Sequence, residues 1–208
     1  HYPPFEPVQP ARPTRLFLGH ELTYDQLFAR SVLRDVAPGE AAAAAGLNCP
    51  NCGASVEVKA PDESERVTCG TCDSLLDCAK GTELYLLSSA KQRIPAPLIP
   101  LGAEGALDGV KYEVYGQLQK SVRAWGEVYT WCEYLLRKEG GGWRWLVESD
   151  GHWSFVEPVD AGDVSPSGSR TLRYDERDHL RFSSASAQVD GLRGEFYWKV
   201  AVGDRVGA

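Results

Sequence analysis

The sequence contains no methionine, only four histidines, and fewer basic than acidic residues: 22 Lys and Arg against 29 Asp and Glu. The net charge of −7 argues against proteins that bind nucleic acid through clustered Lys and Arg side chains. No apolar run approaches the roughly 18 residues of a membrane-spanning helix, so we expect no transmembrane segment. Hydrophobic residues still make up 43% of the 208 residues, which is typical of a folded chain.

Tryptophan is missing from the N-terminal half, since all six tryptophans lie between positions 125 and 198. We therefore expect the main aromatic core in the C-terminal half. The first ten residues instead contain four prolines, which favour extended backbone. Residues 1–44 are predicted to form a proline-rich arm, a short helix at about 24–34 and an alanine-rich linker. A small domain at 45–82 and a β-domain at 83–208 should follow.

Four cysteines carry the clearest chemical motif. Two C-x2-C pairs are separated by sixteen residues, a spacing typical of a zinc site, and their members are Cys49, Cys52, Cys69 and Cys72. Two thiolates on each tight turn complete a tetrahedron that leaves no open position, so we predict one structural Zn²⁺. Gly53 and Gly70 should supply the unusual backbone angles of the turns. Residues 55–59 and 66–68 should be the two strands of this zinc ribbon.

Other uses of these cysteines are less favourable. A disulfide within either C-x2-C pair would close a loop too short to constrain the fold, and the flanks do not supply the strand and helix of a thioredoxin-like site. Cys78 could replace a ligand, while Cys132 is expected to be a buried thiol. Free thiols beside a thiolate site indicate a reducing compartment, so we expect a cytoplasmic protein. Residues 46–80 have three basic and six acidic side chains, which disfavours a nucleic-acid-binding ribbon.

The C-terminal half reads as a series of short strands. Alternating aromatic and β-branched residues predict antiparallel strands over 128–138, 143–148 and 152–157, joined by turns at Gly140–Gly142 and Asp150-Gly151. Further strands are expected at 83–87, 112–119, 171–174, 180–182 and 195–202, with a surface loop at 161–169. The predicted fold class is mainly β: a small zinc ribbon followed by an antiparallel meander or partial β-barrel.

Several of these segments resemble a bacterial family, the domain of unknown function number 4178. The resemblance runs from about Cys49 to Val202 and is carried by Leu101–Gly105, Tyr112–Gly116, Trp131–Leu136, Trp143–Glu148, Asp150–Trp153 and Gly194–Val200. It implies no established activity, but it implies repeated ribbon-plus-β units and an association with bacterial membrane-stress proteins. Because Leu16–Leu22 is similar to the end of such a unit, we expect a repeat or larger assembly, with a preceding unit that ends near Leu22.

Two functions compete. An enzyme, for example a hydrolase, could use Glu133, Asp150 or His152 of the hairpins, with His152 as a base held by a carboxylate. Asp150 is also the residue that a tight turn favours before glycine, and no nucleophile or phosphate-binding motif is present. The excess of tryptophan instead favours a protein-binding surface, with Trp131, Trp143 and Trp145 as contact candidates. We therefore favour a non-catalytic scaffold or adaptor that binds protein partners and not nucleic acid.

Overall fold

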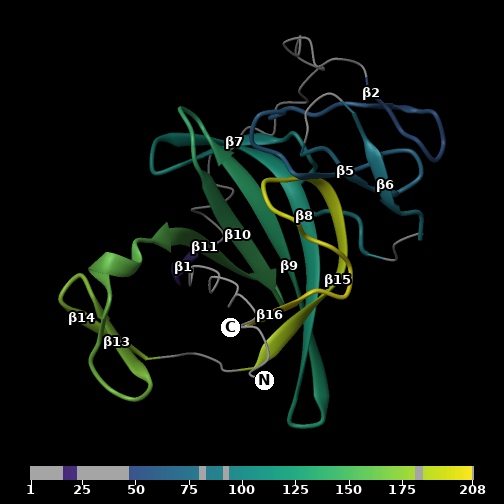
Figure 1. Cartoon of the computed structure of the whole chain (residues 1–208). Coiled ribbons are helices and arrows are strands. Elements are labelled where there is room, and N and C mark those ends of the chain that lie inside the picture. Colours follow the sequence, from purple (N-terminus) through teal and green to yellow (C-terminus); the bar gives the residue numbers. More distant parts are fainter. Residues whose placement is uncertain (1–15, 23–46, 80–82, 91–93, 181–184, 208) are drawn as a thin grey trace, which may run out of the picture. The chain divides into compact units, whose positions relative to one another are not determined.

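The computed structural model describes residues 16–22, 47–79, 83–90, 94–180 and 185–207. The predicted helix at 24–34, nearly all of the proline-rich arm and the alanine-rich linker lie outside these residues. The described part of the chain is built of β-strands, with one short 3₁₀-helix and no α-helix. No helix there is long and apolar enough to cross a membrane. The predicted mainly β, antiparallel fold is confirmed (Figure 1).

The chain divides into two compact units. Of the described residues, 16–18 and 158–180 form one unit, and the remainder form the other. The larger unit contains the four cysteines and most of the main sheet. The predicted boundaries near 45 and 83 lie beside residues that are not described, so they stay predictions.

The main sheet is open and follows the order β1-β11-β10-β9-β8-β15-β4-β5-β6. In addition, β7 pairs with β8 and β16 pairs with β15. Its edge strands are β1 (Leu16–Leu22) and β6 (Tyr85–Ser88). Between β1 and the ribbon strands lie β8 (Val110–Ala124), β9 (Glu127–Lys138), β10 (Trp143–Ser149), β11 (His152–Val159) and β15 (Ser186–Phe196). The side strands are β7 (Glu104–Leu107) and β16 (Arg205–Gly207).

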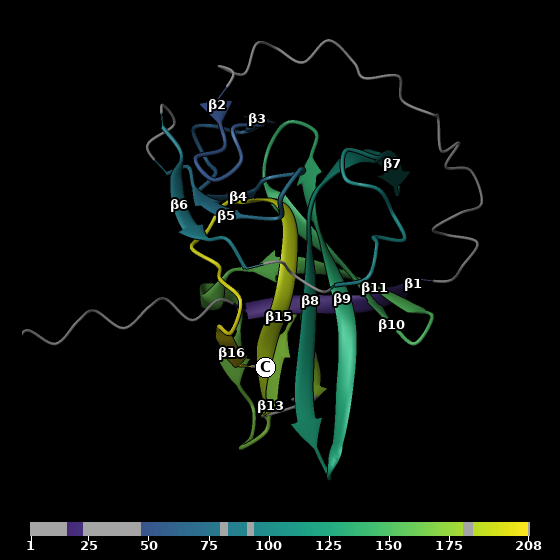
Figure 2. The same cartoon turned by 90° about the vertical axis from the view of Figure 1, so that its right-hand side faces the viewer.

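The predicted meander is confirmed, because β9, β10 and β11 are consecutive antiparallel strands. The turn between β10 and β11 places Asp150 at φ 51° and Gly151 at φ 81°, as a type I′ turn requires. The β8–β9 turn at Trp125-Gly126 is also left-handed, with φ values of 50° and 88°. This hairpin extends past the ends of the neighbouring strands in both views (Figures 1 and 2).

One predicted strand was placed wrongly. Residues 195–202 contribute only Glu195 and Phe196 to β15, which begins earlier, at Ser186. A register shift between Val189 and Gly191 interrupts the alternation of buried and exposed positions, and the polar residues of β15 hide its pattern in the sequence. The aromatic residues after Phe196 leave the strand and pack on the core instead. β8 is also longer than the predicted 112–119.

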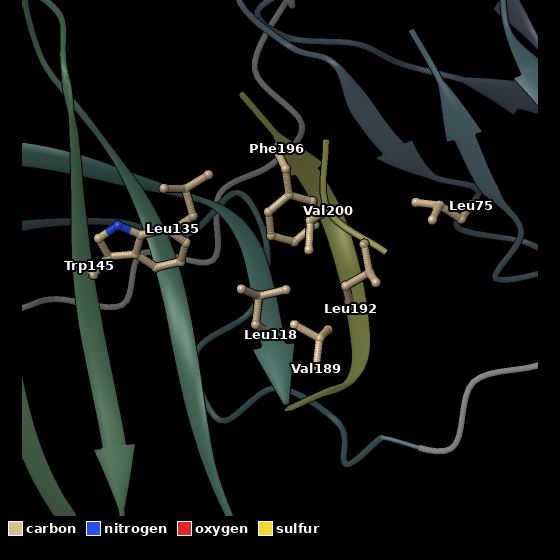
Figure 3. Packing of buried hydrophobic residues seen from close by; sticks show 8 residues of the cluster. All are labelled: Leu75, Leu118, Leu135, Trp145, Val189, Leu192, Phe196 and Val200. Carbon is tan, nitrogen blue, oxygen red and sulfur yellow. The ribbon is translucent and has the colours of Figure 1, made fainter. Parts of the chain in front are cut away.

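Both faces of the central strands are covered by apolar side chains. On β9, Leu135 belongs to one cluster whereas Tyr134 and Leu136 belong to the other, as the alternation of a strand requires. The first cluster, shown in Figure 3, comprises Leu75, Leu118, Leu135, Trp145, Val189, Leu192, Phe196 and Val200. The second comprises Val114, Cys132, Tyr134, Leu136, Leu146, Trp153 and Phe155.

The smaller unit contains a three-stranded sheet of its own. β13 (Thr171–Tyr174) has the predicted bounds and lies between β12 (Ser165–Pro166) and β14 (Arg177–Leu180). Of the strand predicted at 180–182, Leu180 is the last residue of β14, and positions 181 and 182 lie outside the described residues. The predicted loop at 161–169 includes β12 and the 3₁₀-helix η1 (Ala161–Asp163).

Candidate metal centre and its junction with the sheet

The four predicted cysteines lie on two matching turns. β2 (Leu47–Asn48) pairs with β3 (Ser55–Val56), and β4 (Arg66–Thr68) pairs with β5 (Leu75–Asp77). Each hairpin is closed by one C-x2-C pair. The hydrogen bonds repeat: Cys49 N donates to Ala54 O at 2.8 Å, and Cys69 N donates to Ser74 O at 2.9 Å. We call residues 47–79 the ribbon.

Two predictions about the ribbon need correction. The strand predicted at 55–59 ends at Val56, and it belongs to a different hairpin from Arg66–Thr68. The reason is that each C-x2-C turn closes its own hairpin. The left-handed residue after each pair is Gly53, with φ 75°, and Asp73, with φ 58°. Gly70 therefore does not have the predicted role, because Asp73 tolerates the left-handed conformation in the second turn.

The four thiols form a cluster that could hold a metal ion. All four sulfur atoms lie within 4.8 Å of one another, and the Sγ atoms are 3.7 Å apart in the pairs Cys49–Cys72 and Cys52–Cys69. A tetrahedral ion with metal–sulfur bonds of about 2.3 Å has sulfur–sulfur separations of about 3.8 Å. The residues therefore fit a tetrathiolate ion. It is the only such group among the described residues.

Polar side chains support the cluster from outside. Asn51 Nδ2 lies 3.6 Å from Cys72 Sγ and donates to Ser74 Oγ at 3.0 Å. Ser74 Oγ is 3.1 Å from Cys72 Sγ. Hydrogen bonds from the Ser74 hydroxyl, then from its backbone, then from Asn51, lower the pKa of Cys72 to about 6. A thiolate, the form that binds metal, is therefore stabilised at this position.

Cys78 is not a member of the cluster. Its side chain is fully buried, and burial, followed by the charges of Glu195 and Asp77, raises the pKa of its thiol to about 12. Its sulfur is not among the four that lie within 4.8 Å of one another. Cys78 instead joins the ribbon's own core, with Cys49, Val56, Val58, Val67, Cys69 and Leu76. Three of these seven buried residues are cysteines, so the ribbon has little apolar core of its own.

Two ribbon strands, β4 and β5, continue the main sheet, and β15 joins them to its long strands. Strand β15 pairs with β4 at Glu195↔Val67 and Phe196↔Arg66. Thr68 Oγ1 accepts a hydrogen bond from Gly194 N at 2.7 Å. Gly194 has φ 88°, and a Cβ atom there would lie 2.2 Å from the carbonyl oxygen of Tyr115. This glycine is therefore required where β15 crosses from the sheet to the ribbon.

A buried carboxylate completes this contact. Glu195 is almost fully buried, and its oxygens accept hydrogen bonds from the backbone N–H groups of Lys59 and Ala60, both at 2.8 Å. The hydroxyl of Ser64 donates to the same carboxylate. All three donors lie in residues 59–64, between the two cysteine turns. Glu195 therefore fixes the connecting loop of the ribbon from the side of the sheet.

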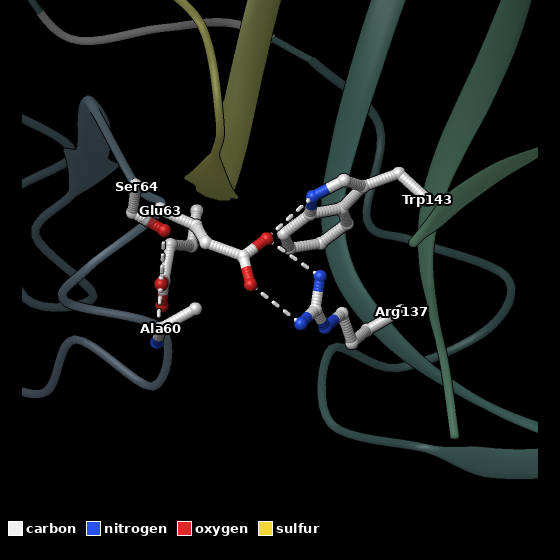
Figure 4. A network of polar contacts seen from close by, with 6 residues as sticks. Ala60, Glu63, Ser64, Arg137 and Trp143 are labelled. Atoms are coloured by element: carbon white, nitrogen blue, oxygen red, sulfur yellow. Dashed lines mark hydrogen bonds and ion pairs between the residues drawn. The ribbon is translucent and has the colours of Figure 1, made fainter. Parts of the chain in front are cut away.

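A second carboxylate points the opposite way, from the ribbon to the sheet. Glu63 accepts two hydrogen bonds from the Arg137 guanidinium, both at 2.6 Å, and one from Trp143 Nε1 at 3.0 Å (Figure 4). The Arg137 guanidinium lies 4.7 Å from the Trp143 ring centre. Trp143 also stacks on Tyr197, with ring centres 5.2 Å apart. Lys59 forms an ion pair with Glu113 nearby.

The predicted catalytic candidates do not converge in the described structure. Glu133 pairs with Lys120 at 2.7 Å and accepts a hydrogen bond from Trp131 Nε1 at 2.8 Å, so its charge is neutralised within the sheet. Asp150 is an exposed turn residue, and His152 is the exposed first residue of β11. Their positions are explained by the turn, and no hydrogen bond or ion pair joins these three described residues.

The three predicted contact tryptophans are not exposed. Trp145 is only 9% exposed and belongs to the core, which corrects its proposed role. Trp143 is half-buried in the junction, and Trp131 is half-buried beside Glu133. The tryptophan that is exposed is Trp125, at 94%. The Trp125-Gly126 pair between two alternating runs could have indicated this turn in the sequence.

The sequence reasoning also missed Glu63 and Glu195. Nothing in the local pattern marks either residue, because their partners are far away in the chain: Glu195 binds a loop about 130 positions earlier, with separations of 131 to 136 residues. Only the topology, which places β15 between β8 and β4, brings these segments together.

Comparison with known proteins gives one match. A family model described as Domain of unknown function (DUF4178) matches residues 100–208, about half of the chain. The match begins after the ribbon, so the four cysteines lie outside it. The resemblance expected from Cys49 onward is thus confirmed from residue 100 and not for the preceding residues, which include the ribbon. No curated protein and no solved structure matches the chain.

Proposed function

The chain belongs to the DUF4178 family, and we propose that this member is a non-catalytic assembly module whose ribbon is held by one structural zinc ion. The observation that carries the proposal is the geometry of the four sulfur atoms, with two separations of 3.7 Å across matching turns. Four thiolates in a tetrahedron suit Zn²⁺, and they leave no coordination position for water or a substrate. The metal would therefore stabilise the fold, not perform chemistry.

The polar groups of the junction support a structural role. Glu63 and Glu195 are each satisfied by donors across the contact between ribbon and sheet. Charge-assisted hydrogen bonds of this kind fix the geometry of the contact. Glu133, the best placed of the catalytic candidates, is likewise held by Lys120 and Trp131. A ribbon fixed in this way is a rigid part of a binding scaffold in a reducing compartment.

The tip of the β8–β9 hairpin is the proposed contact surface for a protein partner. Trp125 is 94% exposed, and the nearby Val128 and Tyr129 are 51% and 46% exposed. The Trp125 and Tyr129 rings contact each other edge to face, with centres 6.4 Å apart. Aromatic side chains on a rigid turn are typical anchors of protein interfaces, because they lose little conformational entropy on binding.

Metal analysis tests the first half of the proposal. We expect one zinc per chain after purification under reducing conditions, and none in the Cys52→Ser variant. X-ray absorption should give four sulfur neighbours at about 2.3 Å. A chain that folds without metal, or a coordination sphere that includes nitrogen, would contradict the structural zinc site.

Capture experiments test the second half. The immobilised chain should retain partner proteins from an extract of its native host. The double variant Trp125→Ala, Tyr129→Ala should not retain them. The matched control is Leu180→Ala, which removes another exposed apolar side chain, 71% exposed, from the smaller unit. Equal loss with both variants would count against the hairpin tip. Turnover abolished by Glu133→Gln would show an enzyme and overturn the assembly role.

A further inference from the structure

Besides the pairing of β4 with β15, one ribbon segment makes several polar contacts with the sheet. Residues 59–64 connect the two cysteine turns, and they supply the Lys59 and Ala60 N–H groups, the Ser64 hydroxyl and the Glu63 carboxylate. The segment itself contains no regular strand. Its conformation is therefore set by the cysteine turns on either side of it and by Glu195, which binds both of its ends.

An aromatic group of the sheet lies against this segment. Trp143 stacks on Tyr197 and meets Tyr115 edge to face, each with ring centres 5.2 Å apart. The Trp143 N–H is bonded to Glu63, and Lys59 Nζ lies 5.5 Å from the Tyr115 ring centre. We call Tyr115, Trp143 and Tyr197 the aromatic face. Two ribbon side chains thus touch it directly.

The ribbon and the sheet differ in what holds them folded. The ribbon's buried cluster of seven residues includes two of the four clustered thiols, so it cannot be expected to persist without the ion. Of the eight residues in the first sheet cluster, Leu75 alone comes from the ribbon, and the second sheet cluster contains no ribbon residue. The sheet therefore keeps nearly all of its core when the ribbon unfolds.

From these contacts we propose that metal occupancy of the four-cysteine cluster controls whether the aromatic face is covered. The inference rests on the proposed structural zinc. With the ion bound, residues 59–64 are ordered and cover the face. When the ion leaves, the ribbon unfolds, Glu63 and Lys59 withdraw, and Trp143 becomes accessible while the sheet stays folded. The chain would then present a second apolar surface only in its metal-free state.

Hydrogen exchange read by mass spectrometry tests this on the full chain, before and after zinc is removed with a chelator under reducing conditions. We expect peptides covering 47–79 to lose at least about tenfold in protection, while peptides from β8–β11 keep theirs. Acrylamide quenching of tryptophan should increase, and Trp143→Phe should remove that increase. The inference would be overturned if the sheet lost protection together with the ribbon after chelation, or if the ribbon stayed protected without metal.

Variants distant from the sulfur atoms test the coupling itself. Binding equilibria are reciprocal, so a weaker junction must weaken zinc binding. Glu195→Gln should lower zinc affinity by at least about fivefold, the lower range of such couplings. Glu63→Gln should increase quenching of Trp143 while zinc is still bound. Asp62→Asn is the matched control, because Asp62 is an exposed acid on the same segment.

The outcomes separate this inference from the proposed function. A purified chain that binds no zinc would refute the structural metal, and the inference with it. A chain that binds one zinc, but whose affinity for it is unchanged by Glu195→Gln and whose Trp143 stays shielded after chelation, would keep the structural metal. That second result would overturn only the control of the aromatic face.

Discussion

The ribbon and the central strands of the sheet are stabilised in different ways. Ribbon strands β2 to β5 are two or three residues long, whereas β8 and β9 have 15 and 12 residues. The long strands bury apolar side chains on both faces, in two separate clusters. The ribbon has one small cluster and brings four thiols together at its tip. Where the strands are too short to form a core, a metal ion can take its place.

The junction joins these two kinds of structure. β15 belongs to the sheet along most of its length, and its last two residues pair with β4 of the ribbon. Gly194 makes the crossing possible because no side chain would fit against the Tyr115 carbonyl. The two regions are therefore one unit with two sources of stability. Substitutions at particular positions should weaken one source and leave the other unchanged.

The largest effect is expected from the loss of a metal ligand. Cys49→Ser should release the ion and unfold residues 47–79, because structural zinc contributes on the order of 10 kcal/mol to folding in zinc-finger peptides. The sheet should remain folded. Zinc content and hydrogen exchange of the purified variant measure both parts.

The control for this prediction is another buried thiol in the hydrophobic core of the ribbon. Cys78→Ala removes a sulfur atom that is not among the four clustered thiols, so zinc should stay bound and the cost should be only about 1 kcal/mol. If Cys78→Ala also released the ion, the assignment of ligands would be wrong.

A smaller effect, confined to the sheet, is expected from its core. Leu135 is fully buried in the first cluster, and Leu135→Ala should reduce the free energy of unfolding by about 2–5 kcal/mol. Zinc content should not change, because the four thiols are in the ribbon. Urea denaturation followed by fluorescence, together with metal analysis, checks both statements. Loss of zinc in this variant would mean that the ribbon depends on the sheet core.

At the junction the expected cost is lower still. Thr68→Val preserves shape but leaves Gly194 N without its hydrogen-bond acceptor, at a cost of about 1–3 kcal/mol. Thr130→Val, at an exposed position on β9, should be close to neutral. The difference in urea midpoint between the two variants measures the contact between ribbon and sheet. Equal midpoints would show that this hydrogen bond contributes nothing.

Local patterns in the sequence predicted much of this arrangement. The spacing of the cysteines indicated the thiol cluster, and Asp150-Gly151 indicated the turn between β10 and β11, because both depend on residues close together in the chain. The start of β15 was missed because its register shift and polar residues hide the strand period. Glu63 and Glu195 were missed because their partners follow from topology alone.

The surface was the hardest part to predict from the sequence. A tryptophan in an alternating strand can face either side of the sheet, and burial depends on what covers that side. Trp145 faces a cluster that includes Val200 from the C-terminal segment, so it is buried. Trp125 lies in a turn where nothing covers it among the described residues, and it is 94% exposed. Composition alone does not distinguish these two positions.

The smallest and most selective effect should come from alkaline pH acting on one tyrosine of the sheet, whereas acid should act on the ribbon. Metal-binding thiolates compete with protons, so acid should release the ion and loosen the ribbon first. Burial, then the charges of Glu113 and Glu195, raises the pKa of Tyr115 to about 12. Because the folded state favours the neutral phenol, its contribution is complete below pH 10 and is lost as the pH rises toward 12.

Tyr115→Phe keeps the ring but removes the ionisable hydroxyl. The variant should therefore lose less unfolding free energy than the wild type as the pH rises, and should respond to acid as the wild type does. Burial raises the pKa of Tyr134 in the same direction, so some alkaline dependence should persist in the variant. Tyr129→Phe, in the exposed hairpin tip, is the control and should behave as the wild type. Unfolding free energies measured between pH 9 and 11, roughly the range around the ordinary tyrosine pKa, make the comparison. If Tyr115→Phe lost as much unfolding free energy at alkaline pH as the wild type, ionisation of Tyr115 would not contribute to that loss.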